Sequence, residues 1–182
     1  MAGSPRWSRI VVAGLVTGAV MVAVNKGGEE SSPSRRAVVP SRLDIPSLGI
    51  KAPLMKLGVT NGEIDVPPFD KPDTAGWVKE SAVPGDPGSA VILGHVDTKT
   101  DPAVFYRLKQ MREGQVIKVA RSDGKVAQYR VDSIEQVSKD RFPADKVYLQ
   151  DGLRLITCGG SFDWNKHEYR DNVIVYATLV KT

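Results

Sequence analysis

Short runs of β-branched and aliphatic residues recur from residue 43 onward, and they constrain the fold more than any other feature of the chain. Gly, Pro, Asp and Asn, which are typical of turns, separate most of them, and Ser122-Asp123-Gly124 is a clear hairpin signal. The runs are residues 43–45, 50–57, 90–93, 116–120, 126–137, 153–157 and 173–180. Short strands at regular spacing predict a mainly β fold, a closed or nearly closed barrel with small helices in its connections.

Helical patterns are few and short. We expect helices at about residues 103–110 and 143–149, and a further one at residues 74–79. The barrel should occupy residues 42–182, which are enough to bury about two-thirds of their surface around one core. No internal repeat is visible.

An uncharged run, residues 10–24, follows Arg6 and Arg9 and precedes Lys26. As a helix it would span about 22 Å, against about 30 Å for the hydrocarbon core of a bilayer. It is therefore either the core of a signal peptide or a short signal anchor. Met21 makes a poor cleavage site, which favours the anchor. The basic residues before it predict a cytoplasmic segment 1–9 and an exported body.

Residues 25–41 are rich in Gly, Ser and Pro and lack a periodic apolar pattern, which is typical of a flexible linker. Beyond residue 36 the chain carries 20 cations and 19 anions, and aromatic residues make up 7% of the whole sequence. A nearly neutral body with few aromatic residues argues against a nucleic-acid partner.

Cys158 is the only cysteine, so no disulfide can form within the chain. It ends the apolar run 153–157, where it falls on the opposite strand face from Thr157, and two glycines follow it. This placement suits a nucleophile presented by a strand to an incoming peptide. A lone cysteine is also often a small buried apolar residue, and that interpretation stays open.

His95 also follows an apolar strand, and Arg170 opens the last one. If the last strand pairs antiparallel with residues 153–157, Arg170 and Cys158 share one rim of the barrel. A thiolate nucleophile, a histidine that protonates the leaving amine and an arginine that holds an oxyanion would form a coherent catalytic set. The alternatives are a structural histidine and a surface ion pair of Arg170 with Asp171 or Glu168.

Metal chemistry has little support in the sequence. A zinc site from His95, Cys158 and His167 would lack any closely spaced ligand pair, and we expect His167 to be a solvated loop residue. No calcium-loop pattern occurs. We expect no cofactor.

Five motifs carry a resemblance to a known family. They are Arg42-Leu43-Asp44-Ile45-Pro46 with Ile50-Lys51-Ala52-Pro53, Ala75-Gly76-Trp77, Pro84-Gly85-Asp86 through Gly94-His95-Val96-Asp97, Leu155-Ile156-Thr157-Cys158, and Tyr169-Arg170-Asp171-Asn172 through Ala177. In this order the chain resembles the sortases, cysteine transpeptidases of Gram-positive cell surfaces. It is most similar to the class E and class F branch of actinobacteria.

The resemblance implies an eight-stranded sortase barrel in which Cys158 attacks the Thr–Gly bond of a Leu-Pro-x-Thr-Gly-like sorting signal. His95 would act as general acid and then base, Arg170 would hold substrate or oxyanion, and Thr157 would line the groove. The partners would be signal-bearing surface proteins and an amine from a peptidoglycan precursor or a pilin, with water as the slower acceptor.

The resemblance also implies where substrate specificity lies. One wall of the groove would be the loop 138–150, including Arg141, Phe142 and Pro143, and the neighbouring loop 161–169 would contribute Trp164. Arg154 stands where the family usually has threonine and would place a charge on the face of Cys158. Asp97 and Thr98 would either orient His95 or cap a turn.

Two other functions remain open. The first is an exported cysteine peptidase that acts mainly as a hydrolase, although a papain-like enzyme would place its cysteine before its histidine. The second is a non-catalytic surface-binding module with a structural cysteine.

Overall fold

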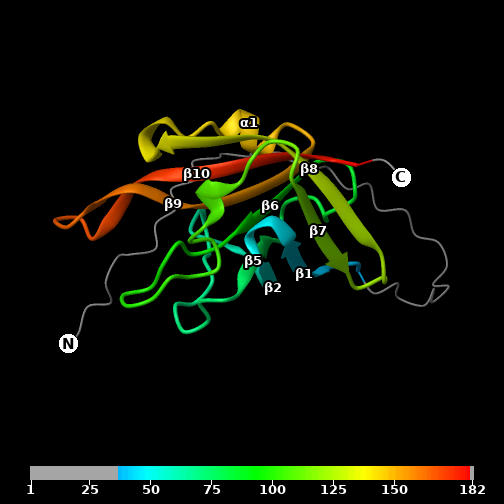
Figure 1. Ribbon diagram of the computed structural model, residues 1–182, viewed down its shortest axis with the longest axis horizontal. Coiled ribbons are helices and arrows are strands. Elements are labelled where there is room, and N and C mark those ends of the chain that lie inside the picture. The colour runs from blue at the N-terminus through cyan, green and yellow to red at the C-terminus, as the bar shows by residue number, and fades with distance from the viewer. Residues whose placement is uncertain (1–36, 181–182) are drawn as a thin grey trace, which may run out of the picture.

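A computed structural model describes residues 37–180, which form one closed barrel with short helical turns in its connections (Figure 1). Its order around the barrel is β1-β2-β5-β6-β9-β10-β8-β7. The barrel strands are β1 (Pro40–Ile45), β2 (Ile50–Leu57), β5 (Ala75–Val78), β6 (Ser89–Leu93), β7 (Val116–Arg121), β8 (Val126–Ser138), β9 (Gly152–Asp163) and β10 (Glu168–Leu179). The predicted eight-stranded barrel is confirmed.

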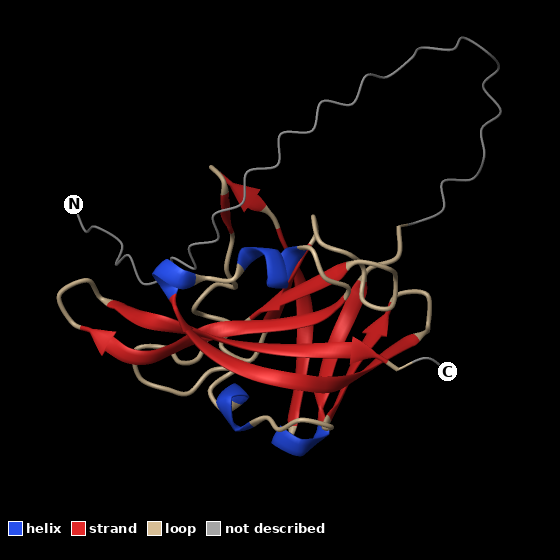
Figure 2. Ribbon diagram, turned by 90° about the horizontal axis from the view of Figure 1, so that it is seen from above, coloured by secondary structure: helices blue, strands red, loops and turns tan. Residues whose placement is uncertain are grey.

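The remaining elements are small. Strands β3 (Val59–Thr60) and β4 (Glu63–Ile64) make a separate hairpin, and α1 is Ala144–Tyr148. Three 3₁₀ turns complete the set within the described residues: η1 (Pro46–Leu48), η2 (Leu108–Gln110) and η3 (Lys139–Arg141). Figure 2 shows these helices outside the barrel wall rather than within it.

Two neighbouring pairs in the barrel are parallel, β2 with β5 and β6 with β9, and the others are antiparallel. The β6–β9 pair runs from Ser89 opposite Gly152 to Leu93 opposite Ile156. Because parallel strands end on the same edge, this pair delivers the residues that follow Leu93 and Ile156 to one rim. That rim is the place where the candidate site is built.

Apolar residues cover both faces of the central strands. Ile92, Leu155 and Val175 belong to the cluster that fills the barrel, whereas Leu93 and Ile156 belong to a second cluster on the outer face. The outer cluster also includes Val147 of α1, which is fully buried. This double burial explains why the sequences of β6 and β9 contain uninterrupted apolar runs rather than alternating ones.

The prediction of a helix at residues 74–79 is wrong, because this segment is β5. It lies between β2 and β6, and Gly76 lets the strands approach, since a Cβ there would overlap the Leu57 side chain. Residues 103–110 fold into successive turns with i to i−3 hydrogen bonds, of which only η2 is helical. The helix at 143–149 is confirmed as α1, and the hairpin at residues 122–124 joins β7 to β8, with Gly124 at φ 82°.

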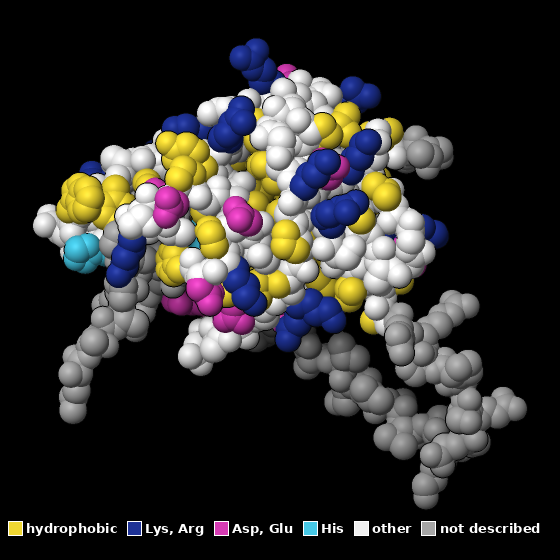
Figure 3. All heavy atoms as spheres, turned by 60° about the horizontal axis from the view of Figure 1, so that its bottom comes forward, with side chains coloured by type: hydrophobic (Ala, Val, Ile, Leu, Met, Phe, Trp, Pro, Cys, Tyr) yellow, Lys and Arg dark blue, Asp and Glu magenta, His cyan; other side chains and the backbone are white. Residues whose placement is uncertain are grey.

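The amino-terminal predictions fall mostly outside the described residues. The cytoplasmic segment 1–9, the apolar run 10–24 and residues 25–36 of the linker lie there, and β1 begins at Pro40 within the expected linker. Within residues 37–180 no helix has the length and apolar character to cross a bilayer. The face drawn in Figure 3 carries basic, acidic and apolar side chains together, in line with the near-neutral body.

Candidate active site

His95 and Cys158 reach one rim through the parallel β6–β9 pair. Leu93 lies opposite Ile156, and the Gly94 N–H donates to the Ile156 carbonyl at 3.1 Å. His95 and Cys158 each follow two residues later, His95 beyond the end of β6 and Cys158 within β9 on its outer face. The pairing thus delivers two residues that are far apart in sequence to the same rim of the barrel, and their joint role in catalysis stays a prediction.

Thr157 lies on the other face of the same strand. It is 1% exposed, and its hydroxyl donates to the Gly94 carbonyl at 2.7 Å. This bond fixes the ends of β6 and β9 against each other. The role of Thr157 in substrate binding stays a prediction, and its observed contact is structural.

Cys158 is partly buried and packs against the outer apolar cluster. Burial raises the pKa of its thiol, Asp97 and Glu168 raise it further, and Lys139 opposes them. Lys139 also pairs with Glu168 at 3.3 Å, so the charge of this cation is partly neutralised. The resting cysteine is therefore a neutral thiol.

The two glycines after Cys158 are needed for the close packing of β10 against β9. A Cβ at Gly159 would come within 2.7 Å of Val173 Cγ2, and one at Gly160 would overlap the Asp171 carboxylate. Gly160 also has φ 74°, at a point where the β9–β10 register shifts. They let β10 lie close beside the nucleophile strand.

His95 is held by two residues of the connection between β4 and β5. Its Nε2 lies 2.5 Å from the Pro67 carbonyl oxygen. Because that oxygen can only accept a hydrogen bond, Nε2 carries the proton and Nδ1 is the unprotonated ring nitrogen. Phe69 stacks on the imidazole with ring centroids 4.2 Å apart. Burial lowers the pKa of His95, while the Pro67 bond and Asp97 act in the opposite direction. Sequence reasoning missed Pro67 and Phe69, because no spacing rule links them to a histidine so much later in the chain.

Arg170 lies beside the site without contacting its centre. The strand β10 pairs antiparallel with β9, as expected, with Asn172 directly opposite Cys158. The Arg170 side chain is 64% exposed, and its Nη2 donates to the Asp163 carboxylate at 3.2 Å. The ion pair therefore involves Asp163 rather than the predicted Asp171 or Glu168.

The predicted groove wall, Arg141, Phe142 and Pro143, connects η3 to α1. Arg141 ends η3, and Phe142 and Pro143 lead into α1. Phe142 packs against the same outer cluster as Cys158, and its ring centroid lies 6.2 Å from that of Tyr148. Phe142 and Cys158 therefore contact one apolar cluster, and the role of this segment in substrate binding stays a prediction.

Trp164 occupies a different position. The expected loop 161–169 is mostly strand, because β9 and β10 continue as a hairpin with a turn at residues 164–167. Trp164 is 75% exposed at this turn and packs edge-on against Phe162, with ring centroids 4.8 Å apart. The strand rises by about 17 Å from Cys158 to Asp163. Trp164 is thus remote from the thiol, and His167 lies in the same turn.

Arg154 is buried rather than groove-lining. Only 3% of it is exposed, and its guanidinium donates to the backbone carbonyls of Lys146, Gln150, Asp151 and Leu153. It also lies 5.1 Å from the centre of the Tyr176 ring. The Arg154 side chain lies on the same face of β9 as Cys158, as predicted, but its guanidinium holds the segment after α1 in place.

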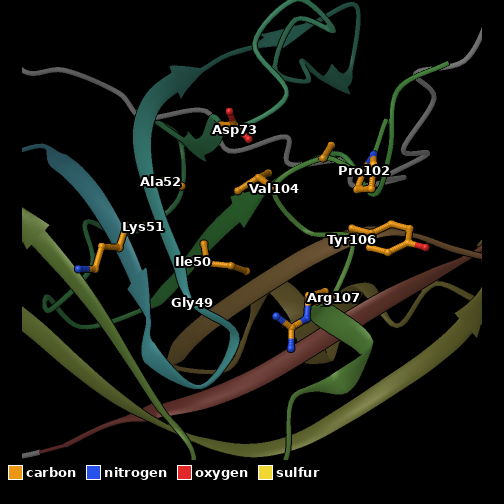
Figure 4. A pocket seen from close by; sticks show the side chains of 10 residues that line it. Gly49, Ile50, Lys51, Ala52, Asp73, Pro102, Val104, Tyr106 and Arg107 are labelled. Atoms are coloured by element: carbon orange, nitrogen blue, oxygen red, sulfur yellow. The ribbon is translucent and has the colours of Figure 1, made fainter. Parts of the chain in front are cut away.

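Three cavities lie in or near this part of the barrel. One of about 280 Å³ is lined by Cys158, Asp97 and Tyr169, and the Tyr169 hydroxyl donates to the Asp97 carboxylate. A second of about 580 Å³ lies between Phe69 and residues 98–101. A third of about 390 Å³ lies between β2 and residues 102–107 and includes neither His95 nor Cys158 (Figure 4). Within residues 37–180, no three His, Cys, Asp or Glu side chains are grouped so that they could hold a metal ion.

Known proteins share this fold and its sequence pattern. The sortase domain model matches residues 43–180. Sortase C-1 of Actinomyces oris superposes with a TM-score of 0.61 at 23% identity, over 78% of this chain and 74% of that one. Sortase A of Corynebacterium diphtheriae, a lid mutant, gives 0.61 at 22% identity over 82% and 75%. Sortase C2 of group B Streptococcus pilus island 1 gives 0.59 at 19% over 78% and 73%. A comparison with curated proteins gave no match.

The match over residues 43–180 covers most of the chain, whereas the structural likenesses, at such low sequence identity, establish the fold alone. The chain belongs to the sortase family. It is accordingly a cysteine transpeptidase, a class that acts on surface proteins.

Proposed function

We propose that this chain cleaves a Leu-Pro-x-Thr-Gly-like sorting signal between Thr and Gly and transfers the acyl group to an amine. The observation that supports the proposal is the β6–β9 register, which ends both strands at one rim, where His95 follows β6 and Cys158 stands on the outer face of β9. An extended peptide laid along this face would present its carbonyl carbon to Sγ.

The steps follow from the protonation states. The raised pKa of Cys158 and the lowered pKa of His95 make a neutral pair the resting state. Attack then requires His95 Nδ1 to take the thiol proton while Sγ bonds to the Thr carbonyl carbon. The resulting imidazolium returns that proton to the Gly nitrogen as the C–N bond breaks, leaving a thioester on Cys158.

The second half reverses the first. An incoming amine attacks the thioester carbonyl, His95 removes the extra proton of the attacking nitrogen, and Sγ leaves as the thiol after reprotonation. Arg170 stabilises the oxyanion of both tetrahedral intermediates. The Arg170 side of its pair with Asp163 is exposed, and ion pairs open to solvent contribute little free energy, so the guanidinium can turn toward a bound peptide.

We further propose that the enzyme is of the class E or class F type and works on the outer surface of a Gram-positive cell. The run 10–24 would be an uncleaved anchor, residues 25–41 a tether and residues 42–182 the catalytic domain. The acceptor would be an amine of a peptidoglycan precursor or of a pilin. The groove wall at Arg141, Phe142 and Pro143 would contact the Leu and Pro of the signal. Trp164, in the turn of the β9–β10 hairpin, would contact substrate residues distant from the scissile bond, and the buried Thr157 would support the groove from the inner face of β9.

Intact-mass spectrometry tests the proposal. The full chain in detergent, mixed with a Leu-Pro-x-Thr-Gly peptide, should gain the mass of the acyl fragment, and adding glycine or diaminopimelate should discharge it to the amide. The Cys158→Ala variant should show neither product. Cleavage that persists in Cys158→Ala, or the lack of any adduct across a peptide library varied at the second and third positions, would refute the proposal.

A further inference from the structure

Asn172 is a fully buried polar residue in contact range of the nucleophile. It lies directly opposite Cys158 on β9 and directly opposite Val137 on β8, and its exposed fraction is 0%. Side chains of directly opposed residues in an antiparallel pair lie on the same face, with Cβ atoms about 5 Å apart. The amide is therefore enclosed between an apolar side chain and the thiol.

Neither polar atom of this amide has a hydrogen-bond partner among the described residues, although both are shielded from solvent. Burying an amide without a partner is unfavourable, and native proteins rarely tolerate it without a reason. Apolar neighbours surround it, including Ile174 two residues along the same strand face. A valine or leucine would fit the surroundings better if packing were the sole requirement.

The sulfur of Cys158, which lies opposite the amide, can supply an acceptor when its charge changes. A neutral thiol is a weak acceptor, whereas a thiolate is a strong one. The charged or titratable groups around the sulfur are Asp97 in the loop after β6, Lys139 in η3, and Glu168 and Tyr169 at the start of β10. Two of these are anions, so the thiolate has little stabilisation from side-chain charges.

We propose that Asn172 is a catalytic residue whose Nδ2–H donates to Cys158 Sγ when the thiol has lost its proton. The amide is already shielded from solvent beside Cys158 in the resting enzyme, so little solvent has to reorganise when the charge develops and the Nδ2–H turns toward Sγ. Asn172 then stabilises the thiolate before attack and again when Sγ leaves the acyl group. The catalytic part of this inference rests on the proposed function, but thiolate stabilisation itself does not require a peptide substrate.

A matched pair of substitutions tests it, Asn172→Val and Asn172→Thr. Both are β-branched and similar in size, and they differ in the hydroxyl donor that only threonine keeps. The measurement is the rate of alkylation by iodoacetamide across pH, followed by intact mass on the full chain in detergent. Since Cys158 is the only cysteine, all thiol label reports on it.

We expect Asn172→Val to slow alkylation about ten- to a hundredfold at neutral pH, with the profile displaced to higher pH, and Asn172→Thr to recover part of the loss. The melting temperature of Asn172→Val should equal or exceed that of the wild type, because the substitution removes a buried amide without partners. Acylation by the sorting peptide should slow in parallel in kcat, with KM little changed.

Two results would overturn the inference. One is an alkylation profile of Asn172→Val that matches the wild type. The other is an equal loss in the Val and Thr variants accompanied by lower melting temperatures, which would make the amide a structural group. A wild-type enzyme that alkylates as expected but forms no thioester with any sorting peptide would refute the proposed function and leave this inference standing.

Discussion

The two ends of the β6–β9 ladder differ in how their buried polar groups are hydrogen-bonded. At the amino ends, the Ser89 hydroxyl donates to the Val147 carbonyl at 2.6 Å and Arg154 bonds to four backbone carbonyls. At the carboxyl ends, Cys158 is a neutral thiol and Asn172 opposite it has no partner among the described residues. The first end uses polar groups to hold the barrel and α1 together, whereas the second keeps them available for a reaction.

Substitutions at the two ends of the ladder should therefore affect different properties. A change at the carboxyl ends should alter chemistry with little effect on stability, and a change at the amino ends should do the reverse. The following variants test that division, in order of decreasing effect.

Replacing His95 by Asn should give the largest loss. The variant lacks the proton carrier, so acylation by the sorting peptide should fall by about 10²- to 10⁴-fold. Its carboxamide can still donate to the Pro67 carbonyl, so the midpoint of urea unfolding should change little. Stopped-flow mass spectrometry measures the first quantity and tryptophan fluorescence the second. A large loss of stability would show that His95 is mainly a structural residue.

Arg154→Met should destabilise the chain by about 3 kcal/mol, because the backbone carbonyls around the guanidinium lose a charged donor in a buried site. Alkylation of Cys158 in the folded variant should stay close to the wild-type rate. Arg130→Met is the matched control, since Arg130 is exposed and makes one long contact of 3.4 Å with the Gly114 carbonyl. Equal unfolding midpoints for the two variants would contradict the anchoring role.

Arg170→Ala should slow acylation by about 10²-fold, the usual cost of removing an oxyanion donor, without slowing iodoacetamide alkylation. Asp163→Asn should leave acylation unchanged or raise it slightly, because it frees the guanidinium from its resting partner. Single-turnover kinetics with the sorting peptide distinguishes the two. If Asp163→Asn were as inactive as Arg170→Ala, the ion pair itself would be the functional unit.

Asp97→Asn should give the smallest effect, a shift of the pH profile. The Asp97 carboxylate raises the pKa of both Cys158 and His95, so its removal lowers both values. The alkylation profile should therefore move to lower pH, while the acid limb of acylation, set by His95, moves the same way. Tyr169→Phe, which removes the hydrogen bond to Asp97 and keeps the charge, is the control. A displacement toward higher pH would contradict the assignment.

Much of the barrel could be predicted from the sequence, because its strands are rich in β-branched residues and are bounded by residues typical of turns. The strand β5 was not, because its short sequence with a glycine and a tryptophan carries no period, and only pairing with β2 and β6 makes it extended. The same limit applies to the hairpin β9–β10, whose outer part is polar and has the composition of a loop.

The candidate site divides in a similar way. Cys158, His95 and Arg170 could be proposed from the sequence, because each stands next to an apolar strand and the motif order resembles one family, and their catalytic roles stay predictions. The contacts of Pro67 and Phe69 with His95 were not, because they depend on the path of a connection between strands. The sequence also could not show that Arg154 and Asn172 are buried, because burial of a polar residue leaves no local signal. For the same reason it could not show that Arg154 makes hydrogen bonds in its buried site whereas Asn172 makes none among the described residues.

The parallel β6–β9 pair has a consequence for folding. Its two strand segments, Ser89–Leu93 and Gly152–Ile156, lie far apart in sequence. The chain must therefore lose the entropy of closing the long loop between them before their contacts can stabilise it, and such long-range parallel pairing is intrinsically slow. Until the ladder closes, Cys158 lacks the proposed acid His95, even if the β9–β10 hairpin has already brought Asn172 opposite it. Recovery of peptide cleavage during refolding should therefore lag behind recovery of fluorescence from Trp77, which lies in β5 next to β6 in the barrel order.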